Sequence, residues 1–368
     1  MIRIIFTTLI GIHGLIHILG FVKAFKYAAI KELTLPISRS QGLLWLLSCL
    51  LFISTSILFM AGNELWWLTA GIAVLISQVL VIVFWRDAKF GTIPNAVILL
   101  VSVVALAEFG FERGVSNEVE QILSRSVGKD TSPLSTEMIT SLPEPVEHWL
   151  KNTGVVGKER VLTVRLEQHV QMKMQPDQQD WTEAFALQYF TTDPPAFIWK
   201  VDMQLIPLVN ISGRDRFMGG KGGMLIKLLW LVPVVNSSDN EKINKGTLQR
   251  YLGEIVWFPS AAVSPFITWE KIDALSAKAS MTYMGTTGSG IYQFDEHGNF
   301  LSFRAERYMG GEDDAQLREW VIAVKENKIM NGIKIPAKME VTWKLDSGAW
   351  TWLKLEITRI EYNETFEK

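Results

Sequence analysis

The sequence predicts an α+β membrane protein, in which a four-helix transmembrane N-terminal region precedes an antiparallel β half-barrel or curved-sheet domain with one or two helices. Two observations lead to this fold class. Four long apolar runs follow one another and end at Phe109. In the remaining chain, apolar and polar residues alternate, as they do in strands with one solvated face. We therefore expect a transmembrane region over 1–109, a linker over 110–140 and an extracytoplasmic β domain over 141–368.

Each of the four apolar runs approaches the roughly 20 residues that a helix needs to cross a bilayer. The runs are Ile2–Val22, Leu43–Met60, Leu65–Trp85 and Ile93–Phe109. The first is longer than the apolar core of a signal peptide and has no small-residue cleavage pattern at its end, so we interpret it as a retained anchor.

Basic residues in the loops predict the orientation of the spans. The first loop contains Lys23, Lys26, Lys31 and Arg39, the third contains Arg86 and Lys89, and the second contains no basic residue. The positive-inside rule then makes the first and third loops cytoplasmic. Four spans place both termini and the β domain outside the cytoplasm. We expect a multi-pass membrane protein, with the lipid bilayer as its partner.

Charge and cysteine content exclude several classes of site. Up to Phe109 the chain has seven basic and four acidic residues, which leaves 29 basic residues against 34 acidic ones beyond it. Nucleic-acid binding needs a clustered basic surface, so we expect no nucleic-acid partner. The one cysteine, Cys49, lies in the second apolar run, which excludes a disulfide framework and a Cys-based metal site.

Two histidines in the first span share one helix face, because His13 and His17 lie four residues apart. They fit a pair of haem or metal ligands, or a role with protons or lipid headgroups. They also fit a packing face, in which Gly20 allows close approach and the imidazoles bond to Gln78 or Ser48. We favour packing, because no other span offers a histidine as a second axial ligand.

Period-two alternation begins at Val161 and recurs along the chain. After this first long strand, the expected strands are Thr182–Phe190, Phe197–Leu205, Asn210–Met218, Lys271–Tyr283, Ser289–Asp295, Phe300–Tyr308, Ile335–Leu345 and Ala349–Tyr362. The segments Asp295–Asn299 and Asp346–Gly348 have the Gly and Asp chemistry of hairpin turns. We expect a meander of eight or more antiparallel strands.

One helix, Asn244–Trp257, interrupts the meander and ends before Pro259. Upstream of it, Met224–Val235 is apolar over twelve residues, too short to cross a bilayer. This run is either core or a segment lying across a cavity or the membrane surface. A curved sheet with the helix and this run over its concave face would enclose a lipid-like ligand, although a filled core is the more economical account.

Several motifs together resemble a bacterial family of uncharacterised multi-pass membrane proteins that is catalogued only as a domain of unknown function. They are Gly14–Phe21, Asp87–Asn95, Tyr189–Thr191 with Asp193–Pro195, Met218–Gly222, Arg250–Pro259 and Ala305–Tyr308. The resemblance covers most of the chain and implies a location in the bacterial inner membrane, but no activity or cofactor. In architecture, the β domain is also similar to the half-barrel proteins that carry lipoproteins through the periplasm.

The candidate ligand-binding residues are Arg214, Arg250, Glu254, Trp257, Glu306 and Arg307. Arginines bind carboxylates or anionic headgroups through paired hydrogen bonds, and Glu254 would fit the role of an acid or a base. The alternative is a charge network that pins the helix to the sheet. No nucleophile elbow, His-Glu-x-x-His motif or paired cysteine occurs, so we name no catalytic residue and no metal ligand.

We therefore expect a membrane-anchored protein that binds a lipid, lipoprotein or other apolar ligand without catalysis and without a cofactor. Two alternatives remain open. One is an enzyme that uses Glu254 and neighbouring arginines on a membrane-derived substrate. The other is a structural or signalling module whose sheet edge docks a partner.

Overall fold

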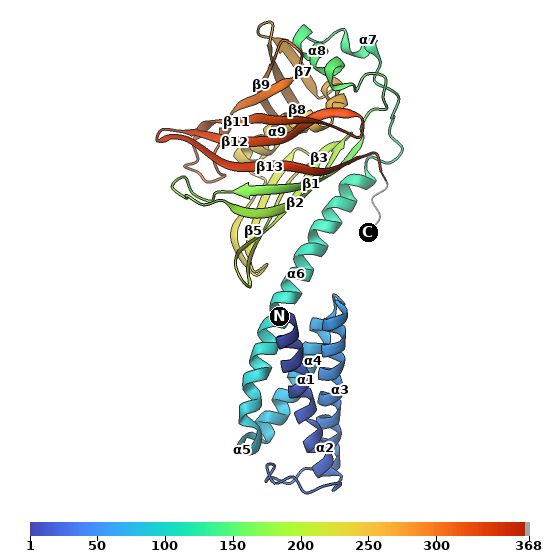
Figure 1. Ribbon diagram of the computed structural model, residues 1–368, viewed down its shortest axis with the longest axis vertical. Helices are drawn as coiled ribbons and strands as arrows, with labels where there is room; N and C mark the ends of the chain where they lie inside the picture. Colours follow the sequence, from blue (N-terminus) through green and yellow to red (C-terminus); the bar gives the residue numbers. More distant parts are fainter. Residues whose placement is uncertain (365–368) are drawn as a thin grey trace. The chain divides into compact units, whose positions relative to one another are not determined.

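The structure is a computed structural model and describes residues 1–364. The chain divides into two units, Met1–Glu112 and Arg113–Lys368. Helices form the first unit and one large β-sheet forms most of the second (Figure 1).

Four helical segments of the described chain are long and apolar enough to cross a membrane, as the sequence predicted. They are Ile2–Ala24, Arg39–Ala61, Trp66–Val83 and Trp85–Ser124. The first consists of α1 (Ile2–Ile16) and α2 (Ile18–Ala24), and the next two are α3 and α4. The last consists of α5 (Trp85–Ala88), the 3-10 turn η1 (Lys89–Gly91) and α6 (Thr92–Ser124).

The helices of the first unit approach one another closely at small residues. A Cβ atom on Gly20 would lie 2.2 Å from the Trp45 ring, and one on Gly14 would lie 2.7 Å from the Cβ of Phe52. Only glycine fits these two positions without a shift of the neighbouring helix. The packing that the sequence suggested around the first span is therefore present.

The two histidines of the first span belong to a buried polar network. Nε2 of His13 lies 2.8 Å from Oδ1 of Asn95, and Nε2 of His17 lies 2.8 Å from Oγ of Ser77. The amide of Asn95 donates to Gln78 at 3.0 Å. Hydrogen bonding between neighbouring helices thus takes place, but Asn95 and Ser77 are the direct partners instead of Gln78 and Ser48.

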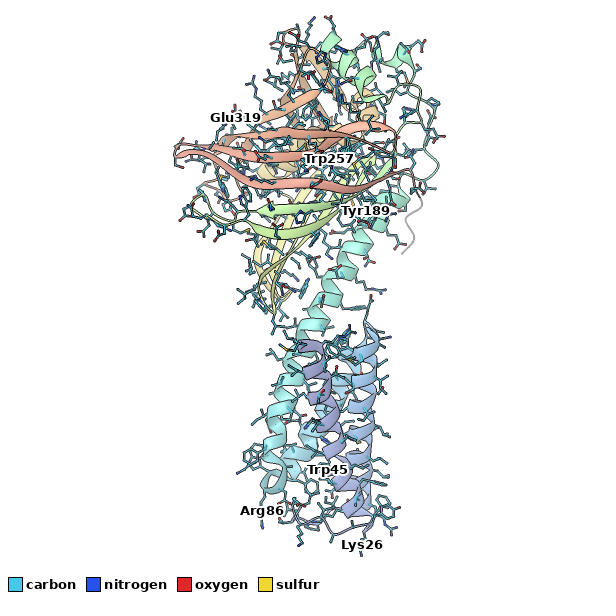
Figure 2. The ribbon with its side chains drawn as sticks, viewed as in Figure 1. Lys26, Trp45, Arg86, Tyr189, Trp257 and Glu319 are labelled. Carbon is cyan, nitrogen blue, oxygen red and sulfur yellow. The ribbon has the colours of Figure 1, made fainter. Side chains whose placement is uncertain are left out.

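The first and third loops are joined by Asp87. Its carboxylate accepts hydrogen bonds from the backbone N–H of Thr34 at 2.6 Å and of Leu35 at 2.9 Å. Lys26 and Arg86 accordingly lie at the same end of the helical unit (Figure 2). Both basic loops therefore share one side of this unit.

Residues 110–140, which the sequence indicated mainly as a linker, begin with the continuation of α6 as a helix to Ser124. Gly110 and Gly114 each cost about 1 kcal/mol relative to alanine in a helix, which is too little to end it. The carboxylate of Glu118 also binds two arginines of the sheet. After α6, the chain forms α7 (Thr136–Ile139) and α8 (Glu144–Thr153), which begins directly after Pro143.

A single antiparallel sheet of thirteen strands confirms the curved half-barrel fold class. The strands are β1 (Thr163–Met172), β2 (Thr182–Thr192), β3 (Pro195–Ile206), β4 (Val209–Met218), β5 (Lys221–Leu228), β6 (Val232–Ser238), β7 (Ile267–Lys271), β8 (Ser276–Tyr283), β9 (Thr286–Phe294), β10 (Phe300–Tyr308), β11 (Leu317–Met330), β12 (Ile333–Leu345) and β13 (Gly348–Tyr362). The chain runs outward from β1 to the edge strand β6 and returns from the other edge, β7, to β13. Strand β13 pairs with β1, so β2, β1, β13, β12 and β11 lie side by side (Figure 1).

Three stretches fold differently from the sequence prediction. The strand expected over Lys271–Tyr283 is interrupted, because Lys271 ends β7 and β8 begins only at Ser276. Strand β11 was not predicted, because its charged second half, Lys325–Lys328, hides the alternation of Trp320, Ile322 and Val324. The run Met224–Val235 does not cover the sheet but belongs to the β5–β6 hairpin that extends it. Leu229 and Trp230 adopt positive φ angles of 51° and 57° in its turn, a role that the sequence would normally give to Gly or Asn.

Helix α9 (Glu241–Glu254) occupies the concave side of the sheet and continues into the 3-10 turns η2 (Ile255–Trp257) and η3 (Pro259–Val263). It begins at Asn240, whose side chain accepts a hydrogen bond from the N–H of Ile243. The helix contacts β4 and β5 on one side and β9 and β10 on the other. It therefore bridges the two outer parts of the sheet, and ten of its 14 residues are buried.

Candidate functional site

A cavity of about 420 Å³ lies between α9 and the concave side of the sheet. Its walls come from α9 and from strands on both sides of the β1–β13 pair, including Met224 of β5, Met339 of β12 and Leu355 of β13. Side chains such as Leu252 and Phe258 are 0% exposed and belong to the hydrophobic core of the domain. The domain thus combines a packed core with an unfilled region under the helix.

Tryptophans form much of the cavity wall. They are Trp199, Trp257, Trp320, Trp343, Trp350 and Trp352. Trp343 of β12 is the direct cross-strand partner of both Trp320 on β11 and Trp350 on β13. Three rings therefore stand in a row on one face of three neighbouring strands, because paired residues point to the same side of a sheet.

A buried ion cluster ties α9 to the sheet beside this cavity. Nη1 of Arg250 on α9 lies 2.7 Å from a carboxylate oxygen of Asp215 on β4, and Nε of the same side chain lies 2.9 Å from Oε1 of Glu254. All three side chains are at most 12% exposed. One guanidinium thus holds two carboxylates in a dry environment, where its partners compensate for lost hydration.

A chain of amide groups completes the hydrogen bonding of Glu254. The amide of Gln188 donates to Oε2 of Glu254 at 2.9 Å, and Gln168 donates to Gln188 at 3.1 Å. The indole N–H of Trp199 donates to Gln168 at 2.9 Å. Both carboxylate oxygens of Glu254 therefore already accept a hydrogen bond from the protein.

Burial dominates the electrostatics of this cluster. It raises the pKa of Asp215 and of Glu254, and the charge of Arg250 opposes this shift in both cases. Burial also lowers the pKa of the Arg307 guanidinium to about 10, and the positive charge of Arg250 acts in the same direction. Asp215, Glu254 and Arg307 have therefore all lost hydration through burial.

The side chain of Arg307 enters the cavity from β10. Its guanidinium makes no hydrogen bond or ion pair with residues 1–364. Its guanidinium carbon lies 4.6 Å from the ring centroid of Trp320 and 5.9 Å from that of Trp343. Its Nε atom is buried without an acceptor. A Cβ atom on Gly246 of α9 would lie 3.0 Å from this Nε, so the glycine leaves the space that the guanidinium occupies.

The comparison with protein families gives one match. A family of unknown function, DUF6920, matches residues 140–362, which is more than half of the chain. This chain belongs to the DUF6920 family. The resemblance to an uncharacterised family that the motifs indicated is therefore confirmed. All residues that line the cavity lie within the DUF6920 region, which also contains every strand of the sheet.

Solved structures include proteins similar to this chain, in addition to the DUF6920 match. The search of curated proteins found no match. Among solved structures, a LolA superfamily protein from Nitrosomonas europaea is similar, with 9% sequence identity and a TM-score of 0.30. The alignment covers 60% of this chain and 94% of that protein.

The DUF6920 domain brings together four of the six residues predicted to bind a ligand. Arg250, Glu254, Trp257 and Arg307 line the cavity. Trp257 lies inside the domain (Figure 2), where its indole donates to the carbonyl of Pro336 at 3.1 Å. A ligand role for these residues stays a prediction, whereas the hydrogen bonds of Arg250 and Glu254 form the helix-pinning network that was the alternative.

The other two predicted residues point away from the cavity. Arg214 precedes Asp215 on β4, and its Nε lies 3.2 Å from the carboxylate of Glu118 on α6. Glu306 precedes Arg307 on β10 and lines a shallow groove on the other face, opposite Glu319. Neighbouring residues of a strand face opposite sides, so only one member of each pair reaches the cavity.

The tryptophan row was not predicted, although one signal for it was present. The hairpin turn expected at Asp346–Gly348 sets the register of the flanking strands, and counting outward from it pairs Trp343 with Trp350. Trp320 lies on the unpredicted strand β11, so counting from this turn could not predict its place in the row. The partners Gln168 and Gln188 carry no sequence signal of their role.

Proposed function

We propose that this protein is a membrane-anchored binding protein that takes an apolar chain, such as the acyl chain of a lipid or lipoprotein, into the cavity under α9 without catalysis. The observation that carries this proposal is a cavity of about 420 Å³ with six tryptophans in its wall, inside a chain with four apolar helices. An apolar wall of this kind favours an apolar occupant, because binding removes both surfaces from water.

The size of the cavity limits the ligand. Pockets for small molecules have volumes of about 300–1,000 Å³, so a cavity of about 420 Å³ suits one chain and excludes a bulky multi-chain lipid as a whole. Each methylene buried there contributes about 0.8 kcal/mol. A single chain of about ten carbons therefore gains enough free energy to bind without any covalent chemistry.

The hydrogen bonding of the ion cluster supports a binding role over an enzymatic one. Arg250 and Gln188 occupy the two oxygens of Glu254, the residue that the enzyme hypothesis uses as acid or base. A proton transfer from Glu254 would first have to break these bonds. We assign the cluster to positioning α9, which forms the roof of the cavity.

The proposal includes an extracytoplasmic β domain in a bacterial inner membrane. Its support is that Lys26 and Arg86 mark one end of the helical unit, where Asp87 links the first and third loops. Basic loops remain cytoplasmic during insertion. A domain on the opposite side would meet lipids and lipoproteins of the envelope.

Native mass spectrometry of the full chain, released from lipid nanodiscs, tests the proposal. The variant Val341→Trp fills the cavity, because Val341 lines it from β12. The matched variant Val321→Trp makes the same change on β11, next to the cavity-lining Ile322 but on the opposite face. We expect a chain-bearing lipid to remain bound to the wild type and to Val321→Trp, and to be lost from Val341→Trp.

Two outcomes count against this function. A wild-type protein that remains bare after exposure to single-chain lipids would argue that the cavity holds only water. Equal retention in the two tryptophan variants would place the bound lipid elsewhere, for example on the apolar helices.

A further inference from the structure

The cavity contains one cation without a protein counterpart. Arg307 is held in place by Trp320 and Trp343 and by the space above Gly246, but no acceptor in residues 1–364 reaches its buried Nε. Arginine in a dry site normally forms paired hydrogen bonds with a carboxylate or phosphate. The neighbouring carboxylates of Asp215 and Glu254 attract its charge, but both form their ion pairs with Arg250 instead.

Three indole N–H groups of the same cavity also lack an acceptor among residues 1–364. The Nε1 atoms of Trp320, Trp350 and Trp352 are buried and have no acceptor among the described residues. The indole N–H can only donate a hydrogen bond, so each of these groups needs an acceptor such as an oxygen atom. By contrast, Trp199 and Trp257 of the same wall donate to Gln168 and to the carbonyl of Pro336.

The charges of the wall do not balance. Its cations are Lys242, Arg250 and Arg307, and its anions are Asp215 and Glu254, which leaves one positive charge in excess. Lys242 Nζ already donates to the carbonyls of Glu312 and Asp313 at 2.8 and 2.7 Å. Arg307 is therefore the cation with free donors, and a single negative charge next to it neutralises the wall.

We propose that the ligand is an amphiphile with one acidic end group, of the carboxylate class found in fatty acids, and that Arg307 binds this group while the chain lies along the tryptophan wall. A carboxylate carries one charge and offers about four acceptor positions to the guanidinium and the indoles. This inference rests on the proposed function and adds the chemical class of the ligand. It assigns to Arg307 a direct contact with the ligand.

Binding of chain-matched probes tests the assignment. Full-length protein in nanodiscs of zwitterionic lipid is titrated with radiolabelled dodecanoate, dodecyl phosphate and dodecanol, with empty nanodiscs as background and acetate as a probe without a chain. We expect dodecanoate to bind about tenfold or more tightly than dodecanol, because a hydrogen bond to a charged group is strong in a dry site. Dodecyl phosphate, which brings more negative charge than the wall lacks, binds less tightly than dodecanoate, and acetate does not bind measurably.

Variants separate recognition of the acid from stability of the fold. Arg307→Gln lowers the affinity for dodecanoate about tenfold or more and leaves dodecanol within about twofold, whereas Arg307→Lys restores part of the loss. Arg304→Gln serves as the matched control, because Arg304 lies on the same strand and is exposed on the other face. Retained binding of dodecanol shows that the variant cavity is intact.

The possible failures are distinct. If neither dodecanoate nor dodecanol binds, the proposed function itself is wrong. If both bind equally, or if Arg307→Gln weakens both to the same extent, apolar binding stands but the acidic end group is overturned. Tighter binding of dodecyl phosphate than of dodecanoate would also overturn the carboxylate assignment in favour of a phosphate-bearing lipid.

Discussion

The guanidinium of Arg250 on α9 binds Asp215 on β4, 35 residues away in the chain, at 2.7 Å. This contact and the bond to Glu254 fasten the helix over the concave side of the sheet. The roof of the cavity is thus held by one buried cation between two carboxylates. Its removal has consequences that can be measured.

The variant Arg250→Met is expected to destabilise the β domain by about 3–5 kcal/mol, because it leaves two buried carboxylates without their partner. Hydrogen exchange of the α9 amides in the full chain measures the effect as faster exchange. The control Lys278→Met removes an exposed pair with Glu270 and should change stability by less than about 1 kcal/mol. Unchanged exchange of α9 in Arg250→Met would contradict the pinning role.

Stability is expected to depend on pH through Glu254. Burial raises its pKa above the ordinary value of 4.5, so between pH 4.5 and this raised pKa the folded state keeps a proton that the unfolded state releases, and above it Glu254 is the anion that pairs with Arg250. The contribution of this group is therefore fully present below pH 4.5 and is lost as the pH rises through the folded pKa. Relative to Glu254→Gln, which does not titrate, the wild type should lose stability as the pH is raised from 4.5.

Thermal unfolding of the two proteins at a series of pH values measures this difference. Glu326 provides a control of opposite sign, because hydrogen bonding to Lys338 lowers its pKa. Its contribution is present above pH 4.5 and is lost as the pH falls, so Glu326→Gln should show no loss of relative wild-type stability at higher pH. A pH-independent gap between the wild type and Glu254→Gln would contradict the shift.

Opposite sides of the membrane are expected for the first loop and the β domain. In a Cys49→Ala background, Lys31→Cys and Ser347→Cys each introduce one exposed thiol, in the first loop and in the β12–β13 turn. An impermeant maleimide added to intact cells with a permeable outer membrane should label Ser347→Cys, whereas Lys31→Cys should react only after lysis. The reverse pattern would show that the number of spans or the orientation is wrong.

The last turns of α6 are expected to be fixed by Glu118. Its carboxylate lies 2.6 Å from Nη1 of Arg216 and 3.2 Å from Nε of Arg214, on the face of β4 away from the cavity. Glu118→Ala should therefore speed hydrogen exchange over 113–124. The control Asn117→Ala changes an exposed neighbour on the same helix and should leave these rates unchanged.

Several parts of the fold follow from local patterns. Apolar runs of membrane length predicted the four long helices, and period-two alternation together with the turns at Asp295–Asn299 and Asp346–Gly348 predicted an antiparallel meander. These signals are local because helix hydrogen bonds and hairpin turns join residues close in the chain. The same reasoning missed β11, whose charged half lacks alternation, and the hairpin turn at Leu229 and Trp230.

The candidate site could be predicted from the sequence only in part, because it depends on pairings between residues that are distant in the chain. The motif containing Arg250 and Glu254 indicated a polar helix face, but nothing local shows that Asp215 binds this arginine or that Arg307 remains without an acceptor. Local patterns were sufficient to predict the long apolar helices and the antiparallel sheet, since length, hydropathy and alternation act over short distances. The tertiary structure alone decided that β13 pairs with β1, that α9 is fastened over the concave side, and that a tryptophan-lined space stays open beneath it. Close packing must satisfy all of these contacts at once, and no single segment contains that information.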